Sequence, residues 1–275
     1  MDPILQALIM GIVQGLTEFL PISSSGHLIL VPYLFGWDDT FLRSLAFSVA
    51  LHGGTLAALL VYFREDWLRL IPAGLATIRD RSFHGDPDRR LAWLLVASTI
   101  PGGIAGFLLN DAAESDAIRQ PGLVAIMLVL AGIVLWLADR WGSRRHDTDN
   151  LTARAAIGIG LAQAIALIPG VSRSGISISA GLAAGLDRAS AARYSFLMAM
   201  PITAAAVAYE GLKLIRGDLG SIEAAPLVVG IVTAFVAGIA AIAVLLRYVR
   251  TRSFSVFVVY RFALAAVVLV AFLSR

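Results

Sequence analysis

The chain has 275 residues, of which 58% are hydrophobic and 15% are charged. Its mean hydropathy of +0.81 is typical of a multi-span membrane protein and excludes a soluble domain. There is no cysteine, which excludes disulfides and thiolate metal sites. The pI is about 9.6, but the net charge is only +3 and nearly all the cations are arginines at the ends of apolar segments. Orientation in a bilayer explains these arginines better than nucleic-acid binding does.

The first apolar segment is interrupted by polar residues. Gln14 and Glu18 lie four positions apart, so they share one face of a helix. Pro21 breaks that helix, and the serines at 23–25 can cap a second helix that contains His27. A helix start with free N–H groups and hydroxyls is suited to bind phosphate. The alternative is a polar kink between two membrane helices.

The two arms around this break are short. The first covers residues 4–20, and the second covers residues 27–36, which is too short to cross a bilayer core that needs roughly 20 residues. We therefore predict a re-entrant hairpin, whose backbone must be walled by other helices. The first residues lack a basic region and a cleavage site, so no removable signal peptide is expected. Three full spans are predicted next, at about residues 44–63, 91–109 and 121–138.

The stretch QGLTEFLPISSSG has an echo, QAIALIPGVSRSG, later in the chain. Gln14 corresponds to Gln163 and Gly26 to Gly175, both at an offset of 149 positions without a gap. This similarity indicates an internal duplication. The copies have diverged at two informative positions: Ser24 corresponds to Arg173, and Glu18 corresponds to Leu167.

The second copy repeats the plan of the first. Its hairpin arms are predicted at residues 155–168 and 176–186, and its spans at 194–212, 225–246 and 255–273. Three spans per copy is an odd number, so the copies must have opposite orientations. The predicted fold is an all-α polytopic membrane protein with an inverted-topology repeat, six full spans and two re-entrant helical hairpins. It forms a single membrane domain, residues 1–275, with repeats of about 1–149 and 150–275. The hairpin tips should meet at mid-membrane and bring Ser24 close to Arg173.

The distribution of cations predicts sidedness. Of the 22 Lys and Arg residues, fifteen fall on one set of loops and five on the opposite set, while Arg173 and Arg261 lie within apolar segments. The Arg-rich loops should be cytoplasmic, with both termini and the mouth of the first hairpin facing outward. The loop at residues 64–90 is interpreted as an interfacial connector.

Three residues stand out because ionisable groups at membrane depth are costly. Glu18 is a functional candidate, with a protonated carboxyl bonded to a neighbouring helix as the alternative. His27 lies beside three serines and Glu18, with simple packing as its alternative. Arg173 stands far from any predicted span end, and its fork of donors matches phosphate oxygens. The neighbouring Ser172, Ser174 and Ser177 are either ligands or caps and packing residues.

Other polar residues are set aside. We interpret His52 as a packing residue, because Gly53 and Gly54 beside it permit close helix approach. Glu210 is expected to reach the interface. Arg261 is expected to snorkel or to pair with the backbone.

Two long motifs together resemble a known family. The first runs from Gln14 to His27, and the second, PGVSRSG, covers residues 169–175; the late pair Tyr260 and Arg261 also fits. The chain resembles the undecaprenyl-diphosphate phosphatases, the membrane family linked to bacitracin resistance, over its whole length. The resemblance implies hydrolysis of undecaprenyl diphosphate to the monophosphate and phosphate. This reaction recycles the lipid carrier for cell-wall synthesis at the outer face of the bacterial inner membrane.

The resemblance also implies a divalent cation, Mg²⁺ or Ca²⁺. Its ligands would be Glu18 and Gln14. Many members of the family have Glu where this chain has Gln14, so Glu18 would supply the only anionic ligand of the motif.

The residues and the resemblance together define a candidate site. Glu18 would hold the metal or act as a base, and His27 would act as a general acid/base or less readily as the nucleophile. Ser24 is the candidate nucleophile, with an activated water as the alternative, and Arg173 would neutralise phosphoryl charge. The remaining candidates are predicted to bind substrate: Gln14, Ser23, Ser25, Gly170, Ser172, Ser174 and Ser177.

Two rival classes stay open at this point. A lipid transporter or flippase has the same architecture and could coexist with the enzyme. A purely structural membrane protein leaves Arg173 unexplained. The expected partner is a polyprenyl diphosphate lipid in the membrane. The metal, the prenyl chain length and homodimerisation are left open.

Overall fold

The computed structural model describes residues 2–42, 44–82, 86–115, 117–215 and 223–274. The side chains of residues 45–46, 110–114, 210 and 213–215 also lie outside the description. Of the cations counted in the charge argument, Arg43, Arg216 and Arg275 therefore lie outside the described residues, and the side chain of Lys213 lies outside the description. The side chain of Glu210, expected to reach the interface, is also outside the description.

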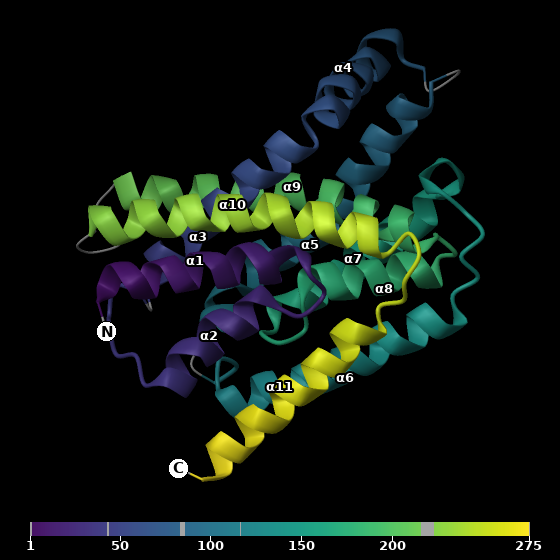
Figure 1. The fold of residues 1–275 in the computed structure, drawn as a ribbon. Helices are drawn as coiled ribbons and strands as arrows, with labels where there is room; N and C mark the ends of the chain where they lie inside the picture. The colour runs from purple at the N-terminus through teal and green to yellow at the C-terminus, as the bar shows by residue number, and fades with distance from the viewer. Residues whose placement is uncertain (1, 43, 83–85, 116, 216–222, 275) are drawn as a thin grey trace.

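The described residues fold into a bundle of α-helices (Figure 1). In chain order they are α1 (Pro3–Phe19), α2 (Ser24–Phe35), α3 (Leu45–Tyr62), α4 (Arg64–Asp80), α5 (Pro87–Glu114), α6 (Pro121–Trp141), α7 (Ala153–Ala164), α8 (Arg173–Ala183), α9 (Arg188–Ile215), α10 (Ala224–Tyr248) and α11 (Ser255–Leu273). Two short 3₁₀ turns, η1 (Thr148–Asn150) and η2 (Ile165–Leu167), precede and follow α7. Each predicted arm and span corresponds to one of these helices.

Five of the described helices are long and apolar enough to cross a membrane: α5, α6, α9, α10 and α11. A sixth span is obtained only if α3 and α4, which are bent by 80° at their junction, are counted together. The chain is therefore a multi-pass membrane protein. The α1, α2 and α7 helices are shorter apolar elements, as expected for the arms of hairpins.

The predicted connector at residues 64–90 contains a helix that the sequence analysis did not identify. Helix α4 projects from the bundle with the start of α5 (Figure 1). Arginine and acidic residues mask its apolar periodicity, but Leu68, Leu75 and Ile78 are all more than 60% exposed along it. Such a helix suits the membrane interface.

The first hairpin packs on a helix of the second half, and the second hairpin packs on a helix of the first half. Helix α1 lies along α10, and α7 lies along α5. A methyl group at Gly11 would come within 2.5 Å of the Gly230 carbonyl oxygen, and one at Gly160 would collide with the Ser98 carbonyl. Gly11 and Gly160 are 149 positions apart. Small residues at the same offset therefore allow the same close approach in both halves.

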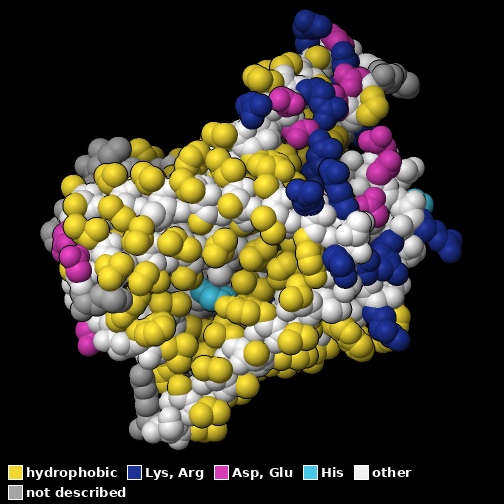
Figure 2. All heavy atoms as spheres, viewed as in Figure 1, with side chains coloured by type: hydrophobic (Ala, Val, Ile, Leu, Met, Phe, Trp, Pro, Cys, Tyr) yellow, Lys and Arg dark blue, Asp and Glu magenta, His cyan; other side chains and the backbone are white. Residues whose placement is uncertain are grey.

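The two hairpins enter the bundle from opposite ends, and their tips meet near its middle (Figure 1). Hydrophobic side chains cover the middle of the surface, whereas Lys and Arg gather toward one end and on the α4 arm (Figure 2). Beneath the hairpin tips, Phe19 packs edge-on against Phe196 of α9, with ring centroids 5.4 Å apart. The division into repeats at about residue 149 stays a prediction.

Candidate functional site

Both hairpins turn through a serine with an unusual backbone. Ser23 has φ 77° and Ser172 has φ 76°, in a region that residues other than glycine seldom adopt. Each serine caps the helix that follows it: Ser23 Oγ accepts from the Gly26 N–H at 3.3 Å, and Ser172 Oγ from the Gly175 N–H at 3.1 Å. Such strain persists where the surrounding structure enforces it, typically at functional sites. The two turns place the first residues of α2 and α8, Ser24 and Arg173, beside the same cavity.

The two tips are hydrogen-bonded to each other. The Gly170 N–H donates to Ser23 Oγ at 3.1 Å, and Ser174 Oγ donates to the Leu20 carbonyl at 3.0 Å. Gly170 has φ +97°, and a Cβ there would lie 2.6 Å from the Val124 carbonyl, so only glycine fits. The predicted meeting of the hairpins is therefore confirmed, with Ser23, Gly170 and Ser174 holding the tips together.

Glu18 is the centre of the cluster at the tips. The residue is 6% exposed, and its carboxylate accepts from Gln14 Nε2 at 3.0 Å and from Ser24 Oγ at 2.5 Å. Arg173 Nη2 of the second hairpin donates to its other oxygen. The structure thus brings Ser24 and Arg173 to one carboxylate, although 149 positions separate them. A hydroxyl donating to a carboxylate is the arrangement of a nucleophile and its base.

The cluster is arranged to attract an anion. The N-termini of α2 and α8 begin at Ser24 and Arg173, and each carries the partial positive charge of a helix start. The Nη1 atom of Arg173 is buried and has no hydrogen-bond partner among the described residues. A buried guanidinium N–H without an acceptor is a vacant donor for an oxyanion.

A cavity of ≈ 320 Å³ opens beside this cluster. Five of the predicted site residues line it: Glu18, Ser24, Ser25, Ser172 and Arg173. Its other walls come from α3, α5, α7, η2 and α9, in the form of Ser48, Val49, His52, Gly102, Gln163, Ala166, Leu167, Ile202, Thr203, Ala206 and Val207. The predicted candidates Gln14, Ser23, His27, Gly170, Ser174 and Ser177 are not among the lining residues, and their direct roles in substrate binding or catalysis stay predictions.

His27 is held on both sides of its ring. Its Nδ1–H donates to the Ser23 carbonyl at 2.7 Å, which leaves Nε2 as the acceptor for the Tyr260 hydroxyl at 2.8 Å in the neutral ring. The two rings stack with centroids 5.7 Å apart. In this arrangement, His27 links the first hairpin to α11.

His52 is the histidine that lines the cavity. Its Nδ1–H donates to the Ser48 carbonyl at 2.8 Å, and its Nε2 lies 3.6 Å from Glu18 Oε2. The prediction that His52 is a packing residue was incomplete, because the local sequence shows the adjacent glycines but not the contact with Glu18. An ionisable group at mid-span alone marks a functional candidate in a membrane protein.

Ser177 does not line the cavity and is hydrogen-bonded within α8 and to α9. Its Oγ lies 2.6 Å from Ser195 Oγ of α9 and donates to the Arg173 carbonyl at 2.7 Å. These bonds anchor the first turn of α8 and so orient Arg173.

Arg261 of α11 is hydrogen-bonded to both hairpins. Its side chain is 0% exposed and donates to the carbonyls of Pro21 at 3.1 Å and Gly170 at 2.8 Å. It also donates to Val171 and Leu128 carbonyls, at 3.1 and 2.9 Å. Pro21 and Gly170 are 149 positions apart, so one guanidinium binds the same carbonyl of each copy. The expected backbone pairing of Arg261 is confirmed, and its position makes it a residue that holds the tips together.

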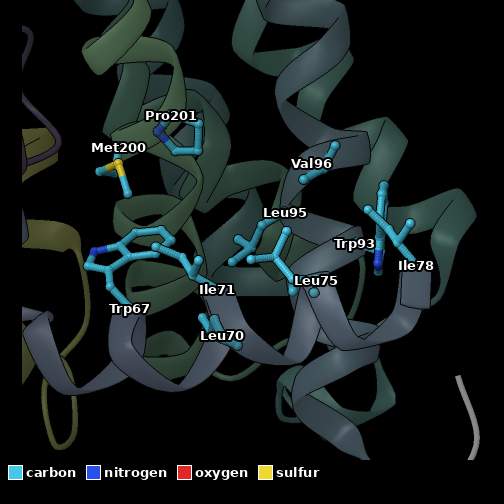
Figure 3. A pocket seen from close by; sticks show the side chains of 12 residues that line it. Trp67, Leu70, Ile71, Leu75, Ile78, Trp93, Leu95, Val96, Met200 and Pro201 are labelled. Carbon is cyan, nitrogen blue, oxygen red and sulfur yellow. The ribbon is translucent and has the colours of Figure 1, made fainter. Parts of the chain in front are cut away.

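A second cavity, of ≈ 310 Å³, lies between α4, α5 and α9 (Figure 3). Its lining includes Trp67, Trp93, Leu75, Met200 and Pro201, and contains no ionisable side chain. It can hold a hydrocarbon chain, but it offers no group for acid–base or nucleophilic chemistry.

The fold and the site define a polytopic membrane protein that holds a carboxylate, a guanidinium and hydroxyls between two helical hairpins, a set of groups that can bind an anion and transfer a proton. A family model described as "Bacitracin resistance protein BacA" matches residues 7–267. The chain belongs to this family.

Curated relatives match nearly the whole chain. A protein named undecaprenyl-diphosphatase from Gemmatimonas aurantiaca is 50% identical over 270 residues, covering 98% of each chain. Proteins of the same name are 46% identical in Desulforudis audaxviator, over 98% of each chain, and 45% identical in Moorella thermoacetica, over 99% of each.

Proposed function

We propose that the protein hydrolyses undecaprenyl diphosphate to undecaprenyl phosphate and inorganic phosphate. Relatives of this name cover the chain almost from end to end. The observation that carries the proposal is the convergence of Ser24 and Arg173 on Glu18 beside a cavity that two helix N-termini face. These are donors for phosphoryl oxygens together with a hydroxyl nucleophile and a base.

Arg173 is the principal group for the diphosphate. Its Nη1 is vacant, and its Nη2 is held by Glu18. Phosphoryl transfer depends on positioning and charge stabilisation more than on covalent chemistry by the protein. The bound diphosphate would occupy the vacant donor and compete with Glu18 for the guanidinium, which leaves the carboxylate free to act as a base.

Ser24 is the proposed nucleophile. Its Oγ attacks the terminal phosphorus, its proton passes to Glu18, and the bond from that phosphorus to the bridging oxygen breaks. Undecaprenyl phosphate leaves with the bond electrons, and water then hydrolyses the phosphoserine to regenerate Ser24. The alternative is direct attack by a water that Glu18 deprotonates. A phosphoserine trapped by rapid acid quench separates the two routes, because direct attack by water forms no phosphoserine.

Two histidines are proposed for proton transfer. His52 lines the cavity and faces Glu18 at 3.6 Å, so it can relay the proton that Glu18 receives. Both ring nitrogens of His27 are hydrogen-bonded, to the Ser23 carbonyl and to the Tyr260 hydroxyl. We propose that His27 acts as an acid or base through the Tyr260 hydroxyl.

A divalent cation, Mg²⁺ or Ca²⁺, is proposed as a cofactor. Among the described residues no group of three His, Asp or Glu side chains is placed to hold a metal without help. Glu18 and Gln14 would hold the cation, which would take its other oxygens from substrate and water. Gln14 Oε1 is buried and without a partner in the described part of the chain, but Nε2 faces Glu18, so the amide would turn over to present its oxygen beside the carboxylate. When bound, the cation would neutralise phosphoryl charge.

The proposed location is the bacterial inner membrane, with the Arg-rich end cytoplasmic and both termini outside. The cation count supports this orientation. Because the chain has no cysteine, single cysteines at Ser274 and Arg145 report the two faces. An impermeant thiol reagent should label only Ser274→Cys in intact cells, and the opposite pattern would reverse the orientation.

The central test is phosphate release by the purified chain in detergent from C55 and shorter prenyl diphosphates. Arg173→Ala should lower kcat/KM by roughly 10³-fold, and His52→Ala by roughly 10²-fold. EDTA should stop the reaction, and added Mg²⁺ or Ca²⁺ should restore it. His27→Ala tests the predicted acid/base role in the same assay.

Failure of the wild-type chain to release phosphate would exclude the activity. Full activity of both Arg173→Ala and His27→Ala would exclude the proposed site. The lipid transporter considered as an alternative gains no support from the comparisons, since the relatives carry a hydrolase name.

A further inference from the structure

Gln163 on α7 is a buried polar side chain without a partner. It is 3% exposed and lines the cavity that contains Glu18 and Arg173. Its Nε2 and Oε1 are both buried, and neither has a hydrogen-bond partner among the described residues. Leaving both ends of an amide unsatisfied is costly, so native proteins rarely do so without a ligand or a water.

The wall opposite this amide is shaped around it. A Cβ at Gly102 of α5 would lie 2.8 Å from Gln163 Nε2 and 3.2 Å from the Ile202 side chain. Gly102 also lines the cavity. The absence of a side chain at this position therefore leaves space for the amide at the edge of the cavity.

The duplication explains why the amide is unpaired. Gln163 corresponds to Gln14, whose Nε2 donates to Glu18 at 3.0 Å, four positions along the same helix face. In the second copy the residue four positions on is Leu167, which cannot accept a hydrogen bond. The second copy thus keeps the donor but lacks the acceptor.

We propose that Gln163 is a substrate-binding residue whose amide N–H donates to a phosphoryl oxygen of the lipid diphosphate. The inference rests on the proposed function, because the ligand is the diphosphate of that reaction. Gln163 and Arg173 come from the two arms of the same hairpin, and each presents an unpaired buried donor. Together they bind phosphoryl oxygens in the cavity beside the Ser24–Glu18 pair.

The test compares Gln163→Met with the wild-type full-length chain in detergent. Methionine keeps the length of the side chain and removes both polar atoms. The KM for a prenyl diphosphate should rise at least tenfold, and the affinity for a non-hydrolysable prenyl methylenebisphosphonate should fall by a similar factor. The midpoint of thermal unfolding should stay level or rise, because the variant removes an unsatisfied buried amide. Gln6→Met on α1 is the matched control: Gln6 is 6% exposed and does not line the cavity.

Gly102→Ala is a second variant that moves the amide without replacing it. Its methyl group would meet Nε2 at 2.8 Å, so it should also raise KM and weaken bisphosphonate binding. If Gln163→Met lowers kcat alone, with KM and bisphosphonate binding unchanged, the proposal is overturned, because the amide would then bind a water molecule and not the substrate. Unchanged kinetics with an active wild type would overturn this inference alone, whereas an inactive wild type would overturn the proposed function.

Discussion

The two hairpins share a backbone and differ in chemistry. Each turns through a serine at positive φ, caps a helix with that serine and presents the helix N-terminus to the cavity. The first carries the carboxylate and the candidate nucleophile, Glu18 and Ser24, and the second carries the guanidinium of Arg173. A turn of this kind is specified locally, so duplication reproduces it. The side chains on it can then diverge without loss of the scaffold.

The difference between the copies places opposite charges together in the candidate site. A buried carboxylate or a buried guanidinium alone would lack a counter-charge, and removing one partner of such a pair is strongly destabilising. Because the tips meet, Glu18 of one copy and Arg173 of the other neutralise each other. An anionic substrate can then compete for the guanidinium.

The largest effect on activity is expected from removing the Ser24 hydroxyl, which has no equivalent in the second hairpin. Ser24→Ala deletes the hydroxyl that donates to Glu18 at 2.5 Å, and phosphate release should fall roughly 10³-fold. Ser25→Ala, at the next position and also on the cavity wall, is the matched control and should lose far less. Ser24→Ala that turns over at the wild-type rate would assign the attack to water.

The next largest effect is expected on stability, from removing the Arg261 guanidinium that is hydrogen-bonded to both hairpins. Arg261→Met removes a donor from five backbone carbonyls, at positions 21, 127, 128, 170 and 171. A buried carbonyl without a donor costs about 1–3 kcal/mol, so the free energy of unfolding should fall by about 3 kcal/mol or more. Thermal unfolding in detergent measures this.

The exposed Arg250 supplies the control for that experiment. Arg250→Met should change stability by no more than about 0.5 kcal/mol. An Arg261→Met variant as stable as the wild type would show that the tips hold together without the guanidinium.

The smallest effect tests what the hairpins have in common. Ser23→Ala and Ser172→Ala each remove the cap of the following helix, and each should cost about 1 kcal/mol. Ser23→Ala should cost slightly more, because Ser23 Oγ also accepts from Gly170. Chemical or thermal unfolding of both variants is the measurement. A loss at only one of the serines would contradict the equivalence of the turns.

Much of the site was predictable because the duplication is visible. The offset of 149 positions places Ser24 opposite Arg173, and opposite orientation of the copies brings the tips together. Pro21 and the PGVSRSG turn predict where the helices break, and the serines predict where they restart. These features depend on residues close together in the chain.

Three residues could not be placed in this way. The contacts of His52 with Glu18, of Arg261 with both tips and of Gln163 with the cavity join distant segments. The glycines beside His52 predicted a packing role, and the depth of Arg261 in a span predicted snorkelling or backbone pairing. Local sequence shows which residues are adjacent in the chain but not which distant groups they contact. Helix α4 was missed because its charges suggest a loop, whereas they lie along an amphipathic helix.

Local sequence specifies the membrane class, the broken helices and the unlike chemistry of the two copies, since hydropathy, proline and capping serines act over a few residues. Which polar groups share the cavity, and which hold the hairpins together, depends on contacts between distant segments. That outcome depends on the close packing of α1 against α10 and α7 against α5, and on the direction in which each buried side chain then points.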